Sequence, residues 1–150
     1  AVVLEVTCPR NIGFMAKKEL FKNKFFVFLG DAYGHFPVDR GARDIEAIKT
    51  SIKMLKEEKI LGIFPEGTRN GMARGLKVHT GVARIALKTG AKVIPVGIKG
   101  PFKLFHKVTI NYGEPIDISE FKTKDKELEK ENTEKATKVI MDKIIELSNK

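Results

Sequence analysis

The chain lacks the residues that mark several common protein classes. Cys8 is its one cysteine, so no disulfide can form within it, and no Cys and His spacing resembles a zinc site. No apolar run reaches the ~20 residues that a membrane-spanning helix needs, and Ala1–Thr7 lacks the form of a signal peptide. The single cysteine favours a reducing compartment. Its 150 residues, 42% of them hydrophobic, suit a single globular domain over residues 1–150.

Acidic side chains are too few to balance the basic ones. The net charge is +9, and nearly all of the excess lies before residue 122. A basic surface attracts nucleic acid, anionic lipid headgroups or phosphorylated substrates, and it also occurs as a plain solvated surface. Tryptophan is absent and tyrosine occurs twice, so few rings besides phenylalanine are available to stack on bases. Nucleic-acid binding therefore rests on charge alone.

Short apolar runs that end at Pro or Gly alternate with helical patterns. Extended segments are expected at Ile12–Ala16, Phe36–Asp39, Ile60–Phe64, Lys92–Val96 and Val108–Tyr112. Helices are expected at residues 1–6, 42–58 and 80–88 and from residue 133 onward, with a linker-like stretch at 114–130. In the second helix, one face carries Ile45, Ile48, Ile52 and Leu55. The alternation predicts an α/β fold with a mostly parallel sheet flanked by helices.

The most informative stretch is Ile60–Gly71, an apolar run that stops at Pro65 and continues as Glu66-Gly67-Thr68-Arg69. In open α/β sheets, ligands bind outside the carboxyl ends of the strands, which is where these residues would lie. Gly67 permits close approach of the backbone to a ligand, and the planar fork of Arg69 suits a phosphate. A β-turn with solvated charges is the plainer interpretation. A nucleotide-binding module is not favoured, because no G-x-x-x-x-G-K-[ST] occurs.

Three ordered blocks resemble the glycerolipid acyltransferases, specifically the 1-acylglycerol-3-phosphate acyltransferases. They are Phe36-Pro37-Val38-Asp39-Arg40-Gly41, Phe64-Pro65-Glu66-Gly67-Thr68-Arg69 and Val93-Ile94-Pro95-Val96. The resemblance implies a glycerol-3-phosphate acyltransferase-like fold. It also implies acyl transfer from an acyl thioester, on coenzyme A or acyl carrier protein, to lysophosphatidate, giving phosphatidic acid. A non-catalytic lipid- or phosphate-binding relative and a basic nucleic-acid-binding domain are the alternatives.

The same resemblance assigns roles to residues. Arg40 and Arg69 would hold the acceptor phosphate, and Glu66, Gly67 and Thr68 would shape the site beside them. Lys77 is a candidate second anion contact, and Pro95 and Val96 would form an apolar wall near the reacting centre. Neither a cofactor nor a metal is implied. The expected partners are lysophosphatidate, the thioester and an anionic membrane surface, with no nucleic acid, at the cytoplasmic face of the membrane.

The family's catalytic His-x4-Asp block is not in this sequence. None of the three histidines, His35, His79 and His106, has Asp five positions on. His35 and Asp39 form a His-x3-Asp pair, but in an extended segment they would lie ~13 Å apart. A surface or packing role is therefore favoured for His35 over a replacement base. We expect the chain to be an N-terminally truncated acyltransferase domain that turns over negligibly by itself.

The segment Lys22–Leu29 interleaves lysine and phenylalanine. Such a segment suits a membrane interface, with its rings at the acyl boundary and its ammonium groups on phosphates. Burial of the rings in the core is the competing and favoured interpretation.

Overall fold

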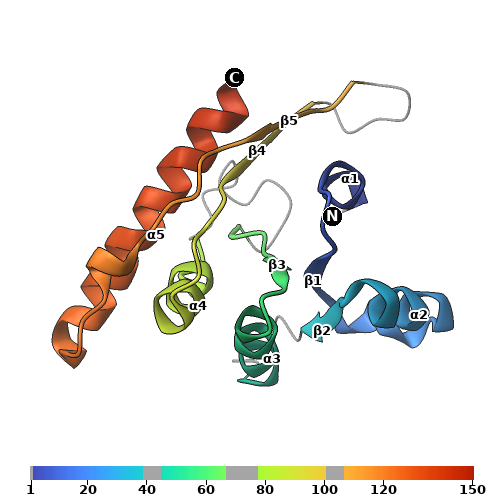
Figure 1. Cartoon of the computed structure of the whole chain (residues 1–150), viewed down its shortest axis with the longest axis horizontal. Helices are drawn as coiled ribbons and strands as arrows, with labels where there is room; N and C mark the ends of the chain where they lie inside the picture. The colour runs from blue at the N-terminus through green and yellow to red at the C-terminus, as the bar shows by residue number, and fades with distance from the viewer. Residues whose placement is uncertain (1, 39–44, 67–77, 101–106) are drawn as a thin grey trace. The chain divides into compact units, whose positions relative to one another are not determined.

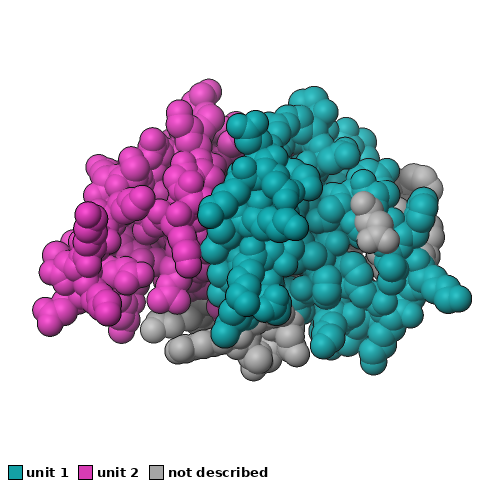
Figure 2. Space-filling view, turned by 60° about the horizontal axis from the view of Figure 1, so that its bottom comes forward, with its two compact units in different colours: residues 1–64 teal, residues 65–150 magenta. Residues whose placement is uncertain are grey.

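The computed structural model describes residues 2–38, 45–66, 78–100 and 107–150. The chain divides into two compact units, residues 1–64 and residues 65–150 (Figure 2). Each unit has its own helices and strands (Figure 1) and is described by itself.

The first unit is a three-stranded parallel sheet with helices. Its elements in chain order are α1 (Val2–Thr7), β1 (Ile12–Lys17), the 3-10 helix η1 (Lys18–Lys22), α2 (Lys24–Tyr33), β2 (Phe36–Val38), α3 (Ile45–Lys56) and β3 (Ile60–Gly62). The strand order is β2-β1-β3, with Met15 opposite Phe36 and Ile12 opposite Ile60. Both neighbours run parallel to β1, which confirms the predicted parallel sheet for this part of the chain.

The packing face of α3 differs from the predicted one. Ala47, Ser51 and Met54 are buried, whereas Ile45 is 62% exposed. Ala47 and Met54 form a cluster with Phe36 of β2. The small side chains of Ala47 and buried Ser51 allow the helix to approach the sheet closely. The helix also ends earlier than expected, because Glu58 has a φ of 57° and cannot continue it.

The second unit joins two helices to an antiparallel hairpin. Its elements are α4 (Gly81–Thr89), β4 (Val96–Lys99), β5 (Thr109–Tyr112), the 3-10 helix η3 (Ser119–Phe121) and α5 (Lys126–Asn149). In the hairpin, Val96 pairs with Tyr112 and Lys99 with Thr109. Helix α5 begins earlier than the predicted residue 133, because the Asp125 side chain accepts a hydrogen bond from the backbone N–H of Glu127 and so caps it.

Helix α4 agrees with the predicted range of 80–88 apart from its cap. Thr80 is at the N-cap position, where threonine is a favoured residue, but its side chain makes no cap hydrogen bond. Gly90 ends the helix as predicted, with a φ of 75° and its N–H donating to the carbonyl oxygen of Ala86 at 2.8 Å.

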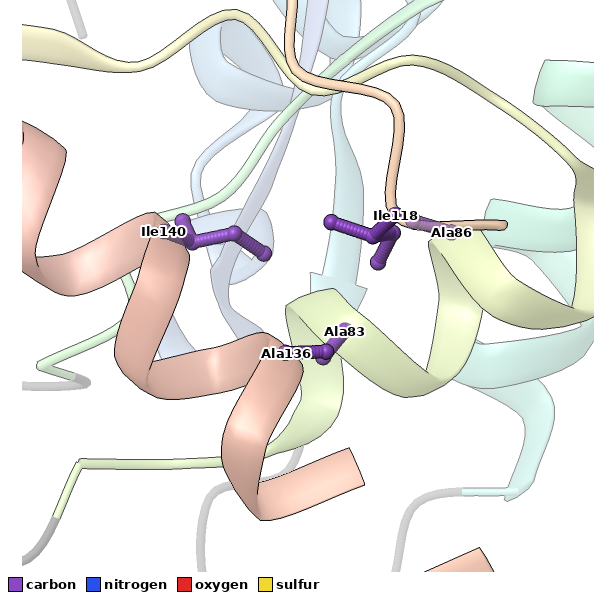
Figure 3. Close-up of a cluster of buried hydrophobic side chains, with 5 residues drawn as sticks. All are labelled: Ala83, Ala86, Ile118, Ala136 and Ile140. Atoms are coloured by element: carbon purple, nitrogen blue, oxygen red, sulfur yellow. The ribbon is translucent and has the colours of Figure 1, made fainter. Parts of the chain in front are cut away.

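The core of the second unit lies between α4 and α5 (Figure 3). Ala83 and Ala86 of α4 face Ala136 and Ile140 of α5, and Ile118 closes the cluster. Alanine at these positions brings the two helices close together, so Ile140 fills the remaining space and is 2% exposed. Along α5, Ala136, Ile140 and Leu147 are buried, whereas Val139 is exposed.

Candidate functional site

Two of the motif blocks begin in or directly after strands that end at the same edge of the parallel sheet. Strand β2 ends at Val38 and β3 at Gly62, and both run parallel to β1 between them. Neighbouring strands lie about 4.8 Å apart, so β2 and β3 are separated by about 10 Å. Both strands end toward the same edge, the one at which open α/β sheets bind ligands. Val38 pairs with Lys17 and Gly62 with Phe14, so β3 ends three residues before β2 along the central strand.

The start of the Phe64 block is held by aromatic packing. The ring of Phe64 stacks on that of buried Phe14, with ring centroids 5.7 Å apart and an interplanar angle of 17°. Phe14 belongs to β1, so the stack fastens the chain directly after β3 to the central strand. Phe64 keeps about half of its surface exposed.

The residues after Phe64 begin a segment whose ends are held together. Glu66 is half-buried in a turn, and the backbone N–H of His79 donates to the carbonyl oxygen of Pro65 at 3.1 Å. The carboxylate of Glu66 is an acceptor only, which suits a hydroxyl or guanidinium partner rather than a phosphate.

Most of the predicted phosphate contacts lie outside the described residues. These are Arg40, Gly67, Thr68, Arg69 and Lys77. Their roles, including the expectation that Arg40 and Arg69 grip one phosphate, stay predictions.

The predicted apolar wall lies at the start of β4. Pro95 comes directly before the strand, and its carbonyl oxygen accepts a hydrogen bond from the N–H of Gly113 at 2.9 Å. The Pro95 side chain is fully buried, whereas Val96 is half-buried and keeps some exposed surface. Of the two, Val96 is therefore the one able to present apolar surface to an acyl chain.

His35 is a packing residue, as the sequence favoured. Its Nδ1 accepts a hydrogen bond from the backbone N–H of Phe14 at 3.2 Å, and its Nε2 lies 3.0 Å from Oε1 of Glu5. An Nδ1 that accepts must be unprotonated, so the ring proton lies on Nε2, facing Glu5. The ring also stacks on Tyr33, with centroids 6.0 Å apart. Neither nitrogen is open to take a proton from a substrate, which argues against His35 as a replacement base.

Glu5 is the residue of this arrangement that sequence reasoning missed. It lies in α1, and its side chain and that of His35 are both largely buried. The approach of Nε2 to Glu5 is not an aligned hydrogen bond, because the buried Oε1 accepts none from the part of the chain that is described. The available signal was a single acid within the apolar run at residues 1–6.

The other histidines and the shifted carboxyl groups are surface features. His79 is exposed, as expected, and His106 lies outside the described residues. The pKa of Glu57 is lowered by a hydrogen bond from Lys59, and that of Asp117 by the backbone N–H of Ser119.

Within residues 2–38, 45–66, 78–100 and 107–150, no three His, Cys, Asp or Glu side chains gather into a metal-binding group. Among those same residues, no helix has the length and apolarity to span a membrane.

The comparisons with known proteins agree with the motif blocks. The Acyltransferase family profile matches residues 1–99. The chain belongs to this family of transferases. A solved acyltransferase structure has the same fold, a parallel sheet flanked by helices.

Individual relatives indicate a narrower group within this family. A 1-acyl-sn-glycerol-3-phosphate acyltransferase of Bacillus subtilis is 38% identical over 147 residues, covering 95% of this chain and 71% of that protein. A protein of the same name from Streptococcus pneumoniae is 38% identical over 122 residues, covering 77% of this chain and 45% of that protein. The crystal structure of the 1-acyl-sn-glycerophosphate acyltransferase PlsC from Thermotoga maritima matches with a TM-score of 0.63 and 25% identity. That match covers 99% of this chain and 62% of the Thermotoga chain.

Proposed function

We propose that the protein to which this chain belongs transfers an acyl group from an acyl thioester to lysophosphatidate. The free hydroxyl of the acceptor attacks the thioester carbonyl, and an ester bond forms as the carbon–sulfur bond breaks. The hydroxyl proton leaves with the thiol, and the products are phosphatidic acid and free coenzyme A or acyl carrier protein. The work is done at the cytoplasmic face of an anionic membrane.

The acceptor headgroup is assigned to the two blocks that follow β2 and β3. Arg40 and Arg69 bind the phosphate, because two guanidiniums suit its bidentate geometry. Glu66, beside Gly67 and Thr68, accepts a hydrogen bond from the acceptor or aligns an arginine, and Lys77 adds a second cation. Val96, held in place by buried Pro95, lies along the acyl chain.

One observation carries this assignment. Strands β2 and β3 flank β1 in parallel, so both strands end toward the same edge of the sheet, which supports the proposal. The names of the Bacillus and Streptococcus relatives support the acceptor named here.

We propose further that these 150 residues bind the headgroup without turning over. No histidine of the sequence has the family's spacing to an aspartate, and both ring nitrogens of His35 are engaged. An acyl transfer without a base for the hydroxyl loses a factor of roughly 100 to 10,000 in rate.

The binding experiment uses glycerol 3-phosphate, which carries the headgroup alone. We expect thermal stabilisation of the chain that is lost in an Arg40→Ala, Arg69→Ala double variant. Arg84→Ala is the matched control, because Arg84 is an exposed arginine on α4 outside the motif blocks. Equal stabilisation in the parent and the double variant would contradict the assignment.

A thiol-release assay with palmitoyl-coenzyme A and lysophosphatidate tests the proposal that these 150 residues do not turn over. We expect no release above the uncatalysed background. Robust release that disappears in His35→Ala would show that this chain carries its own base.

A further inference from the structure

Two apolar side chains of helix α2 are exposed in the structure. Phe28 is 68% exposed and Val27 is 41% exposed. Gly30 marks the packed side, because a Cβ there would lie 2.8 Å from the Phe21 ring and 3.1 Å from the His35 carbonyl oxygen. Residues two apart in a helix lie about 200° from each other, so Phe28 faces away from this packed side. Val27 lies about 60° from Gly30 and is at the margin between the packed and the exposed sides.

The same part of the chain is basic. Residues 17–31 hold four lysines, Lys17, Lys18, Lys22 and Lys24, and two acids, Glu19 and Asp31. Glu19 is occupied by Lys17 at 3.1 Å, and its pKa is lowered by backbone and Lys17 hydrogen bonds. Lys18, Lys22 and Lys24 are exposed.

Exposed single apolar residues are ordinary, but an exposed aromatic side chain in a segment with several exposed lysines is a specific combination. We infer that Lys18, Lys22, Lys24, Val27 and Phe28 form a lipid-contacting surface, the α2 surface, that docks on an anionic bilayer. Phe28 and Val27 enter the acyl boundary, and the lysine stems extend so that their ammonium groups reach lipid phosphates.

An anionic leaflet fits this surface better than a second copy of the chain. Two copies meeting through the α2 surface would bring six lysines of like charge together, which is repulsive. A leaflet supplies apolar depth for Phe28 and negative charge for the lysines at one place. The inference rests on the proposed function, in which the acceptor is itself a membrane lipid.

The test is co-sedimentation of the 150-residue chain with phosphatidylcholine vesicles that contain none or a third phosphatidylglycerol, at low and high salt. We expect binding to the anionic vesicles that weakens at high salt. Phe28→Ser should weaken partitioning roughly tenfold, from the lost apolar burial. Lys22→Gln with Lys24→Gln should weaken it roughly 25-fold at low salt, about fivefold for each lysine.

The controls are a Val139→Ser variant and a Lys124→Gln, Lys130→Gln variant. Val139 is 40% exposed on α5, and both lysines are exposed at or before the start of that helix. These variants should bind vesicles like the parent. Far-UV circular dichroism checks that each variant is folded.

Several outcomes overturn the inference. They are absent binding to anionic vesicles, equal binding by Phe28→Ser and Val139→Ser, and self-association that Phe28→Ser abolishes. Binding to single-stranded RNA in place of vesicles also overturns it.

The glycerol 3-phosphate shift, measured without vesicles, separates the two proposals. Phe28→Ser should keep that shift. Its presence with no vesicle binding overturns the α2 surface alone, and its absence with vesicle binding overturns the acceptor site alone.

Discussion

Replacing Gly97 by alanine tests the packing that holds the Pro95–Val96 corner in place. Gly97 lies in β4, directly under helix α5, where the chain turns past the predicted apolar wall. A Cβ at this position would lie 2.3 Å from the carbonyl carbon of Leu147 and 2.4 Å from the backbone nitrogen of Ser148. These are main-chain atoms, so no side-chain rotation relieves the contact.

The magnitude follows from the distance. Carbon atoms in contact prefer about 3.5–4.0 Å, so α5 must move away from β4 by roughly an ångström or more. Such overpacking costs about 1–3 kcal/mol. The movement also strains the hydrogen bond that Asn111 Nδ2 donates to the carbonyl oxygen of Leu147 at 2.8 Å. The lower entropy of the unfolded alanine chain offsets about 0.4–1 kcal/mol, so we expect a net loss of about 1–2 kcal/mol.

Gly81→Ala is the matched control. Gly81 opens α4, and an added Cβ there meets no atom within 4 Å. The same chemical change should therefore stabilise the protein by about 0.5–1 kcal/mol.

The assay is urea unfolding followed by far-UV circular dichroism, because the chain has no tryptophan to report fluorescence. Free energies come from linear extrapolation of each curve. A Gly97→Ala variant as stable as the parent would refute the stated contact between β4 and α5. A Gly81→Ala variant that is destabilised would refute the open environment of α4's first residue.

Three further predictions concern single contacts. His35→Asn keeps an acceptor for the Phe14 N–H and His35→Gln does not, so hydrogen exchange at Phe14 should stay slow only in the first. The loss in His35→Gln should cost about 1–3 kcal/mol in urea unfolding, because Phe14 is buried. Ile140→Ala should cost about 2–5 kcal/mol in the same assay, since Ile140 is 2% exposed among packed neighbours. Hydrogen bonds from Lys143 and Lys150 lower the pKa of Glu146 below its ordinary 4.5. This carboxylate therefore stabilises the protein above pH 4.5, and the stabilisation is lost as the pH falls through the lower folded pKa. In a plot of the urea midpoint against pH, Glu146→Gln should reduce the fall of the midpoint at acidic pH.

Local patterns were enough for most elements. The apolar run before Pro65, the helix ending at Gly90 and the strand at 108–112 needed only side-chain periodicity and the conformations open to Gly and Pro. These depend on residues adjacent in sequence, and the structure has each within a few residues of the predicted range. The start of α5 was missed because a run of charged residues looked like a linker, whereas the Asp125 cap begins a helix there.

The packing faces of the helices and the contact partners of individual side chains were harder to predict from the sequence. Isoleucines on α3 predicted one face, yet the sheet packs on Ala47 and Met54. The small side chains of Ala47 and buried Ser51 let the helix come close on this face. The contact between Glu5 and His35 joins residues thirty positions apart in the sequence, and no spacing rule connects them. Phe28 was expected to be buried but is exposed, because helix α2 packs through the side that carries Gly30.

The sequence by itself determined the family, the α/β class and the residues proposed to meet the phosphate, because these depend on residue types in a fixed order. Only the tertiary structure decided that both nitrogens of His35 are occupied, that the Pro95 side chain is buried and that Phe28 is exposed. The physical reason is that hydrogen bonding and burial depend on which atoms from distant parts of the chain come within contact distance. Such contacts arise only when strands pair and helices pack.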